Sequence, residues 1–117
     1  MVGDCDDWLW WSTTATGLPK SYREFMKLNE AGQQALLEQM DAFRRGELLR
    51  SVSKITKGIL ELRANVGKNQ FRILFLMDRR VAVVLTAFAK KDQSLSKKDV
   101  ERAESRVRTG HHIAWPQ

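Results

Sequence analysis

The stretch "ELRANVGKNQFRILF", residues 61–75, decides the fold, because it holds two short strands that face each other across a loop. Before the loop the side chains alternate with a period of two, which places Glu61 and Arg63 on one face of a strand and leucines on the other. Asn and Gly in "NVGKN" suit a hairpin turn, and residues 71–77 return as a mostly apolar strand. Arg63 and Arg72 therefore lie close to the same loop on facing strands.

Two permanent cations in a half-buried sheet need an explanation, since unpaired charges are costly to bury. One explanation is structural: Glu61 forms an ion pair with Arg63 on the same strand, or with Arg72 across the hairpin. The other is functional: an anionic ligand meets the arginines. The residues alone leave both open.

The segments around this hairpin complete an α+β fold. Residues 81–88 are almost continuously apolar, which is typical of a strand in the middle of a sheet. We expect a small antiparallel sheet with an N-terminal helical hairpin and a C-terminal helix. The expected elements are a first strand over 8–14, helices over 19–28 and from Asn29 to Gly46, a connecting loop over 47–57, a three-strand meander from 58 to 88, and a helix from Ser96 to Arg108.

Length and composition indicate one soluble domain, residues 1–117, expected in the cytoplasm. No apolar run approaches the roughly 18 residues that span a bilayer. The single Cys5 excludes an internal disulfide, and the adjacent His111 and His112 have no partner at metal-ligand spacing, so we expect no metal and no cofactor. For the tail, residues 110–117, a flexible segment and one folded back through Ile113 and Trp115 both remain open.

Positive charge is concentrated in the second half of the chain. Residues 1–50 carry 8 acidic and 6 basic side chains, whereas residues 51–117 carry 6 acidic and 14 basic ones. A domain with a pI near 9.8 attracts phosphate polymers or an acidic protein through its long-range field. The alternative is that these charges only keep the protein soluble.

The order of these elements resembles the RelE/ParE toxin superfamily, and more closely its HigB-like, phage-derived branch. The similarity spans about Leu18 to Arg106 and rests on "ELR" before the loop, "FR" after it and "FAKK" at the end of the last strand. The resemblance implies a toxin of a type II toxin–antitoxin system: a ribosome-dependent, metal-independent endoribonuclease that cuts messenger RNA. Its implied partners are the ribosome, mRNA and a cognate helix-turn-helix antitoxin, with no membrane; the oligomeric state stays open.

The resemblance also suggests which residues carry the chemistry. Attack of a 2′-hydroxyl on its own phosphate builds negative charge, which fixed cations stabilise without a metal. Arg63 and Arg72 match family arginines, and Lys91, or its neighbour Lys90, falls where the family has a further cation. We expect additional RNA contacts from lysines of the second half, namely Lys54, Lys57, Lys68, Lys97 and Lys98. The alternative for the last helix is that Lys97, Lys98, Arg102, Arg106 and Arg108 form a solvated face.

The general base is the least defined part of the expected site. Where some members of the superfamily carry a pair of lysines, this chain has Ile59 and Glu61. Glu61 could act as the base if its surroundings raised its pKa, and His111 or His112 could if the tail folded back.

Two other functions fit the same fold. One is inhibition of DNA gyrase in the manner of ParE, and the other is a non-catalytic, phage-derived protein-binding module. The clustered strand cations favour RNA cleavage over the first, whereas the missing lysine pair favours the second.

Overall fold

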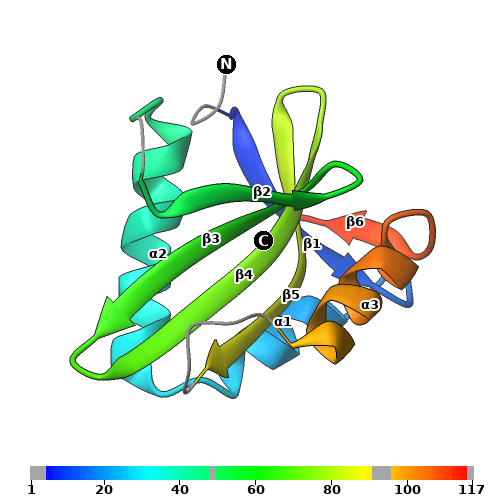
Figure 1. Ribbon diagram of the computed structural model, residues 1–117. Helices are drawn as coiled ribbons and strands as arrows, with labels where there is room; N and C mark the ends of the chain where they lie inside the picture. The colour runs from blue at the N-terminus through cyan, green and yellow to red at the C-terminus, as the bar shows by residue number, and fades with distance from the viewer. Residues whose placement is uncertain (1–4, 48–49, 91–95, 116–117) are drawn as a thin grey trace.

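The computed structural model describes residues 5–47, 50–90 and 96–115, and these residues form six strands and three helices (Figure 1). The elements follow the expected order, with two strands that the sequence pattern did not reveal. Their bounds are β1 Asp7–Ser12, α1 Lys20–Met26, α2 Glu30–Arg44, β2 Val52–Thr56, β3 Ile59–Val66, β4 Asn69–Asp78, β5 Val81–Lys90, α3 Lys97–Arg106 and β6 His111–Ile113.

The sheet is mixed and has six strands in the order β2-β3-β4-β5-β1-β6, so the prediction of a small antiparallel sheet was wrong. The meander β3-β4-β5 is antiparallel as expected, but β1 pairs parallel to β5, with Trp10 opposite Val84. β2 extends the sheet at one edge from a segment that we expected to be a loop, because "VSKIT" is a half-exposed edge strand with little alternation. The overall α+β class is correct.

The expected N-terminal helical hairpin is also wrong, because α1 and α2 pack separately against the sheet. α1 has only 7 residues and packs on β5 and β1, whereas α2 has 15 and packs on β3 and β4. Asn29 caps α2 by accepting a hydrogen bond from the backbone N–H of Gly32 at 2.7 Å. α2 approaches the sheet so closely at Gly32 that a Cβ there would overlap the ring of Phe71.

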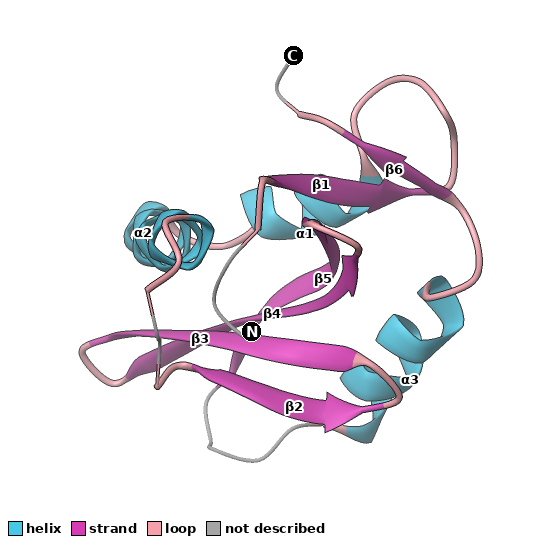
Figure 2. Ribbon diagram, turned by 90° about the horizontal axis from the view of Figure 1, so that it is seen from above, coloured by secondary structure: helices cyan, strands magenta, loops and turns pink. Residues whose placement is uncertain are grey.

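Helices cover both faces of the sheet, which is strongly twisted (Figure 2). The face under α1 and α2 carries the larger apolar cluster, in which Trp8, Phe43 and Phe75 pack ring against ring. The opposite face carries a smaller cluster under α3 that includes Leu74 and Leu85. Because α3 covers only one end of this second face, the other end is left to polar side chains.

α3 is fixed to the body by charge as well as by apolar contact. Arg106 is buried, its guanidinium lies 4.3 Å from the Trp11 ring centroid, and it donates to both carboxylate oxygens of Glu24 on α1 at 2.8 and 2.9 Å. The expectation that Arg106 belongs to a solvated helix face is therefore wrong. No described helix is both long and apolar enough to cross a bilayer.

The tail folds back along β1. Gly110, with φ of 71°, lies so close to Ser12 and Trp11 that a side chain there would clash, and the chain then enters β6. Ile113 is buried and Trp115 packs near Tyr22.

Candidate active site

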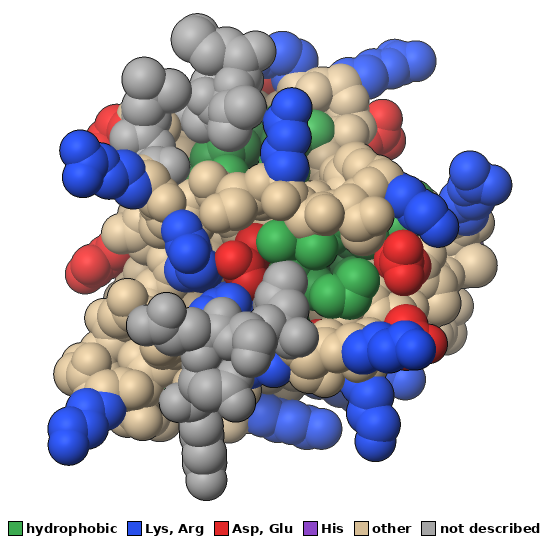
Figure 3. Space-filling model, viewed as in Figure 1, with side chains coloured by type: hydrophobic (Ala, Val, Ile, Leu, Met, Phe, Trp, Pro, Cys, Tyr) green, Lys and Arg blue, Asp and Glu red, His purple; other side chains and the backbone are tan. Residues whose placement is uncertain are grey.

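A strip of polar side chains crosses three strands on the face that α3 leaves uncovered. Alternation along β3 places Glu61, Arg63 and Asn65 on this face, and the register sets Arg63 directly opposite Arg72 on β4. Gln70 lies between Asn65 on β3 and Lys90 on β5. The hairpin predicted from the sequence therefore brings the expected residues Glu61, Arg63 and Arg72 together. In Figure 3 acidic, basic and hydrophobic side chains meet on this face.

Glu61 and Arg72 form a buried ion pair at the base of the strip. Each residue is only 4% exposed, and Arg72 Nη1 donates to Glu61 Oε2 at 2.7 Å. Arg72 Nη2 also donates to the Gln70 side-chain oxygen at 2.7 Å. Held by these two acceptors, the guanidinium has a fixed position and orientation.

Arg63 is the more open of the two arginines. Its Nε lies 3.7 Å from Glu61 Oε1, and its Nη2 donates to the backbone carbonyl of Arg50 at 2.9 Å. Arg63, Asn65, Gln70 and Arg72 line a cavity of about 170 Å³. Since like charges directly opposite each other repel, Glu61 stabilises the two arginines at this spacing.

Lys90, at the end of β5, is held by α3. Its side chain is 13% exposed, and its Nζ lies 3.7 Å from Oδ2 of Asp99, whose Oδ1 accepts a hydrogen bond from Arg102 at 2.6 Å. Arg102 Nε also contacts the buried Thr86 hydroxyl at 3.0 Å. The prediction that Arg102 lies on a solvated face is thus incomplete, because its guanidinium helps to position Asp99.

The strip can bind a phosphodiester group and stabilise the negative charge on its oxygens. The formal charges of the described residues of the strip, three positive on Arg63, Arg72 and Lys90 and two negative on Glu61 and Asp99, sum to +1. Guanidinium groups on its wall can donate paired hydrogen bonds to phosphate oxygens. The amides of Asn65 and Gln70 add polar groups that can contact a nucleotide.

The lysines expected to bind RNA do not form one surface. Lys54 lies opposite Leu60 in the register, on the other face of the sheet from Glu61. Lys57 forms an exposed ion pair with Glu104 at 3.7 Å, near the end of α3. Lys68 lies in the exposed β3–β4 turn, and Lys97 and Lys98 are exposed in the first turn of α3. Lys91 lies outside the described residues.

The two histidines are remote from the strip. β6 is three strands away from β4 in the sheet order, which at 4.7 to 4.9 Å per strand is about 14 Å. His111 and His112 are both exposed on that edge. Across the described residues no three His, Cys, Asp or Glu side chains are grouped as metal ligands.

Sequence reasoning missed three residues that support the site: Gln70, Asp99 and Thr86. Gln70 could have been found from the alternation of β4, because it shares a face with Arg72. Asp99 lies in the first turn of α3, where an acidic residue facing the end of the last strand is a natural partner for Lys90. The role of Thr86 depends on a bulge beside Leu74 that shifts the β5 register, and no sequence signal marks it.

Comparison with known proteins places the chain in a family. Residues 23–108 match the family described as "Phage derived protein Gp49-like (DUF891)". The chain is 35% identical over 100 residues to "Probable endoribonuclease HigB1" of Mycobacterium tuberculosis, in strains CDC 1551 / Oshkosh and ATCC 25618 / H37Rv; the match covers 85% of this chain and 80% of each relative. The chain therefore belongs to the Gp49-like family and is a HigB-like toxin of the RelE/ParE superfamily.

Proposed function

We propose that the chain is the endoribonuclease toxin of a type II toxin–antitoxin pair and that it cleaves messenger RNA on the ribosome without a metal. The observation that supports this most strongly is the cavity between Arg63 and Arg72, in which two guanidinium groups meet across a hairpin. The similarity to proteins named as probable endoribonucleases supports the same chemistry.

The scissile phosphate would bind at the mouth of the cavity. As the 2′-hydroxyl attacks, charge builds on the two non-bridging oxygens, and preorganised donors stabilise this charge more than they stabilise the ground state. Arg72 is the principal donor, because Glu61 and Gln70 fix its guanidinium. Arg63 supplies a second, more mobile cation, and Lys90 one from β5.

Glu61 acts as a positioning residue in this proposal. Its carboxylate is buried beneath the arginines, with one oxygen 2.7 Å from Arg72 and the other 3.7 Å from Arg63. A general base must reach the 2′-hydroxyl proton, and these contacts direct both oxygens toward the guanidinium groups. The ribosome would then orient the RNA and favour deprotonation, which makes cleavage dependent on translation.

The partner that silences the toxin would be a helix-turn-helix antitoxin with acidic side chains, and both would act in the cytoplasm beside the ribosome. Opposite charges raise association rates at low salt. An association rate that falls as salt is raised would support this partner chemistry.

Cleavage of a defined message on translating ribosomes tests the function. We expect the protein to cut the message and Arg72→Gln to reduce the rate by about 10²- to 10³-fold, the usual cost of one lost transition-state donor. Arg79→Gln, in the β4–β5 turn, is the matched control and should cut normally. Growth arrest with intact messages and trapped gyrase complexes would instead support the ParE-like alternative.

A further inference from the structure

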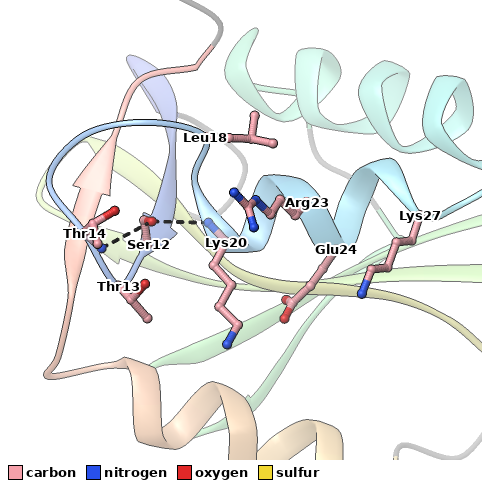
Figure 4. A pocket seen from close by; sticks show the side chains of 8 residues that line it. All are labelled: Ser12, Thr13, Thr14, Leu18, Lys20, Arg23, Glu24 and Lys27. Atoms are coloured by element: carbon pink, nitrogen blue, oxygen red, sulfur yellow. Dashed lines mark hydrogen bonds between the residues drawn. The ribbon is translucent and has the colours of Figure 1, made fainter.

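A second cationic pocket lies between the end of β1, the loop that follows it and α1, and none of the residues that line it belongs to the candidate active site. The α1 pocket has a volume of about 490 Å³, and its polar lining comes from Ser12, Thr13, Thr14, Lys20, Arg23, Glu24 and Lys27. Figure 4 shows Lys20 and Lys27 extending from the same side of α1, with Arg23 turned toward the loop beside Leu18.

The three cations of the α1 pocket form no ion pair with any described residue. In the described parts of the chain, no carboxylate lies within ion-pair distance of Lys20, Arg23 or Lys27. Other surface arginines do have such partners: Arg45 pairs with Asp41 and Glu47. The α1 pocket is therefore a local concentration of available positive charge.

The carboxylate in the pocket does not offset these charges. Glu24 lines the pocket, but both its oxygens accept hydrogen bonds from Arg106, at 2.8 and 2.9 Å, and one also accepts from Thr86 at 2.7 Å. Arg106 therefore neutralises Glu24 from behind. Among the described residues, a ligand in the pocket therefore meets three positive charges and one carboxylate that Arg106 already neutralises.

Hydroxyl groups complete the lining. The Ser12 hydroxyl oxygen accepts from the backbone N–H groups of Lys20 and Thr14, at 3.3 and 3.5 Å, which holds the loop against α1. Thr13 lies exposed beside it. Lysine, arginine, serine and threonine are the side chains that most often contact nucleic-acid phosphates.

We propose that the α1 pocket binds the phosphodiester backbone of single-stranded RNA, as a contact separate from the cleavage site; this inference rests on the proposed function. A protein partner is disfavoured because protein interfaces are anchored by buried apolar or aromatic side chains, and among the described residues Leu18 is the only large apolar one that lines the pocket. Phosphate binding needs only charge and hydrogen-bond donors, which the pocket provides.

The position of the pocket suits a strand that extends from the site. α1 packs on β5, whose last residue is Lys90. A continuous set of contacts runs from Glu24 through Thr86, Arg102 and Asp99 to Lys90. Because α1 and the candidate active site lie on opposite faces of the sheet, RNA that contacts both would pass around the edge that these contacts span.

Salt-dependent binding of an oligouridylate with 2′-O-methyl riboses tests the inference, because the probe cannot be cleaved. Each phosphate contact on a single strand contributes about 0.7 to the slope of log K against log salt. The triple variant Lys20→Gln, Arg23→Gln, Lys27→Gln should lower that slope by about 2. The control triple Arg44→Gln, Arg45→Gln, Arg79→Gln removes the same charge elsewhere and should leave the slope unchanged.

Three outcomes would overturn the inference: no salt-dependent binding by the unmodified protein, equal loss of slope in both triple variants, or weakened antitoxin binding with unchanged RNA binding. The last would make the α1 pocket a protein interface. Failure of the proposed function can be told apart from failure of this inference. If Arg72→Gln cleaves message at the normal rate, the proposed function fails, whatever the salt dependence of RNA binding is.

Discussion

The buried pair of Glu61 and Arg72 gives the sharpest test of the site, because stability and catalysis respond to it differently. Glu61→Gln removes the carboxylate that lies 2.7 Å from the Arg72 guanidinium, which is 4% exposed, and breaking such a buried pair typically costs about 3–5 kcal/mol. Arg72→Gln should cost less, since Arg63 Nε remains 3.7 Å from the Glu61 carboxylate. Both losses are measurable as shifts of the urea unfolding midpoint.

The double variant Glu61→Gln, Arg72→Gln separates the contribution of this ion pair to stability from the contribution of Arg72 to catalysis. With both positions changed to glutamine, neither buried charge of the pair remains and the two amides can hydrogen-bond to each other, whereas Arg63 is part-exposed and keeps its hydrogen bond to the Arg50 carbonyl. We therefore expect the double variant to be more stable than the sum of the single losses implies, by about 2 kcal/mol or more. As the control, Lys57→Gln removes an exposed partner of Glu104 and should cost less than about 1 kcal/mol.

The rate of message cleavage on ribosomes should depend on whether Arg72 is present and not on the free energy of unfolding of the variant. Glu61→Gln retains the cation and should cut within about tenfold of the normal rate, whereas Arg72→Gln and the double variant should both lose about 10²- to 10³-fold. All variants are assayed at a temperature at which circular dichroism shows them folded. A double variant that is folded and cuts normally would refute the role of Arg72, and additive stability losses would refute the pair.

Three further predictions concern the surrounding structure. Glu24→Gln removes the charge that holds α3 and should destabilise the fold by about 2 kcal/mol in urea, whereas the exposed Glu38→Gln should not. Gly32→Ala should destabilise by about 1–3 kcal/mol despite the better helix propensity of alanine, because of the overlap with the sheet; a neutral result would contradict the close packing. The double variant His111→Gln, His112→Gln should cleave message at the normal rate, and a loss of more than tenfold in a folded protein would make the tail the source of the base.

The hairpin of the site was predictable because its signals are local. Alternation along β3 and β4 and the turn residues between them fix which side chains face each other, so Arg63 and Arg72 meet as expected. The last helix was predictable for the same reason, with Ser96 accepting a hydrogen bond from the N–H of Lys98 at 3.1 Å.

The sheet's outer strands were not predictable, because their pairing is set by distant segments. β1 joins the sheet beside β5, more than 70 residues away along the chain, and β6 is a strand of three residues defined only by its place against β1. The prediction of a helical hairpin was wrong for a similar reason, because apolar spacing shows which face of a helix is buried but not whether another helix or a sheet covers that face.

The two cationic sites differ in how their charges are held, and this difference matches the two tasks proposed for them. Arg72 and Lys90 are largely buried and fixed by carboxylates, so little conformational entropy is lost when a transition state forms against them. Lys20 and Lys27 are exposed and unpaired within the described chain, so they can follow an irregular backbone but cannot define its geometry. Each function depends on its own arrangement of charges. A carboxylate partner beside Lys20 would weaken RNA binding, whereas removal of Glu61 would loosen Arg72, the arginine that stabilises the reacting phosphate.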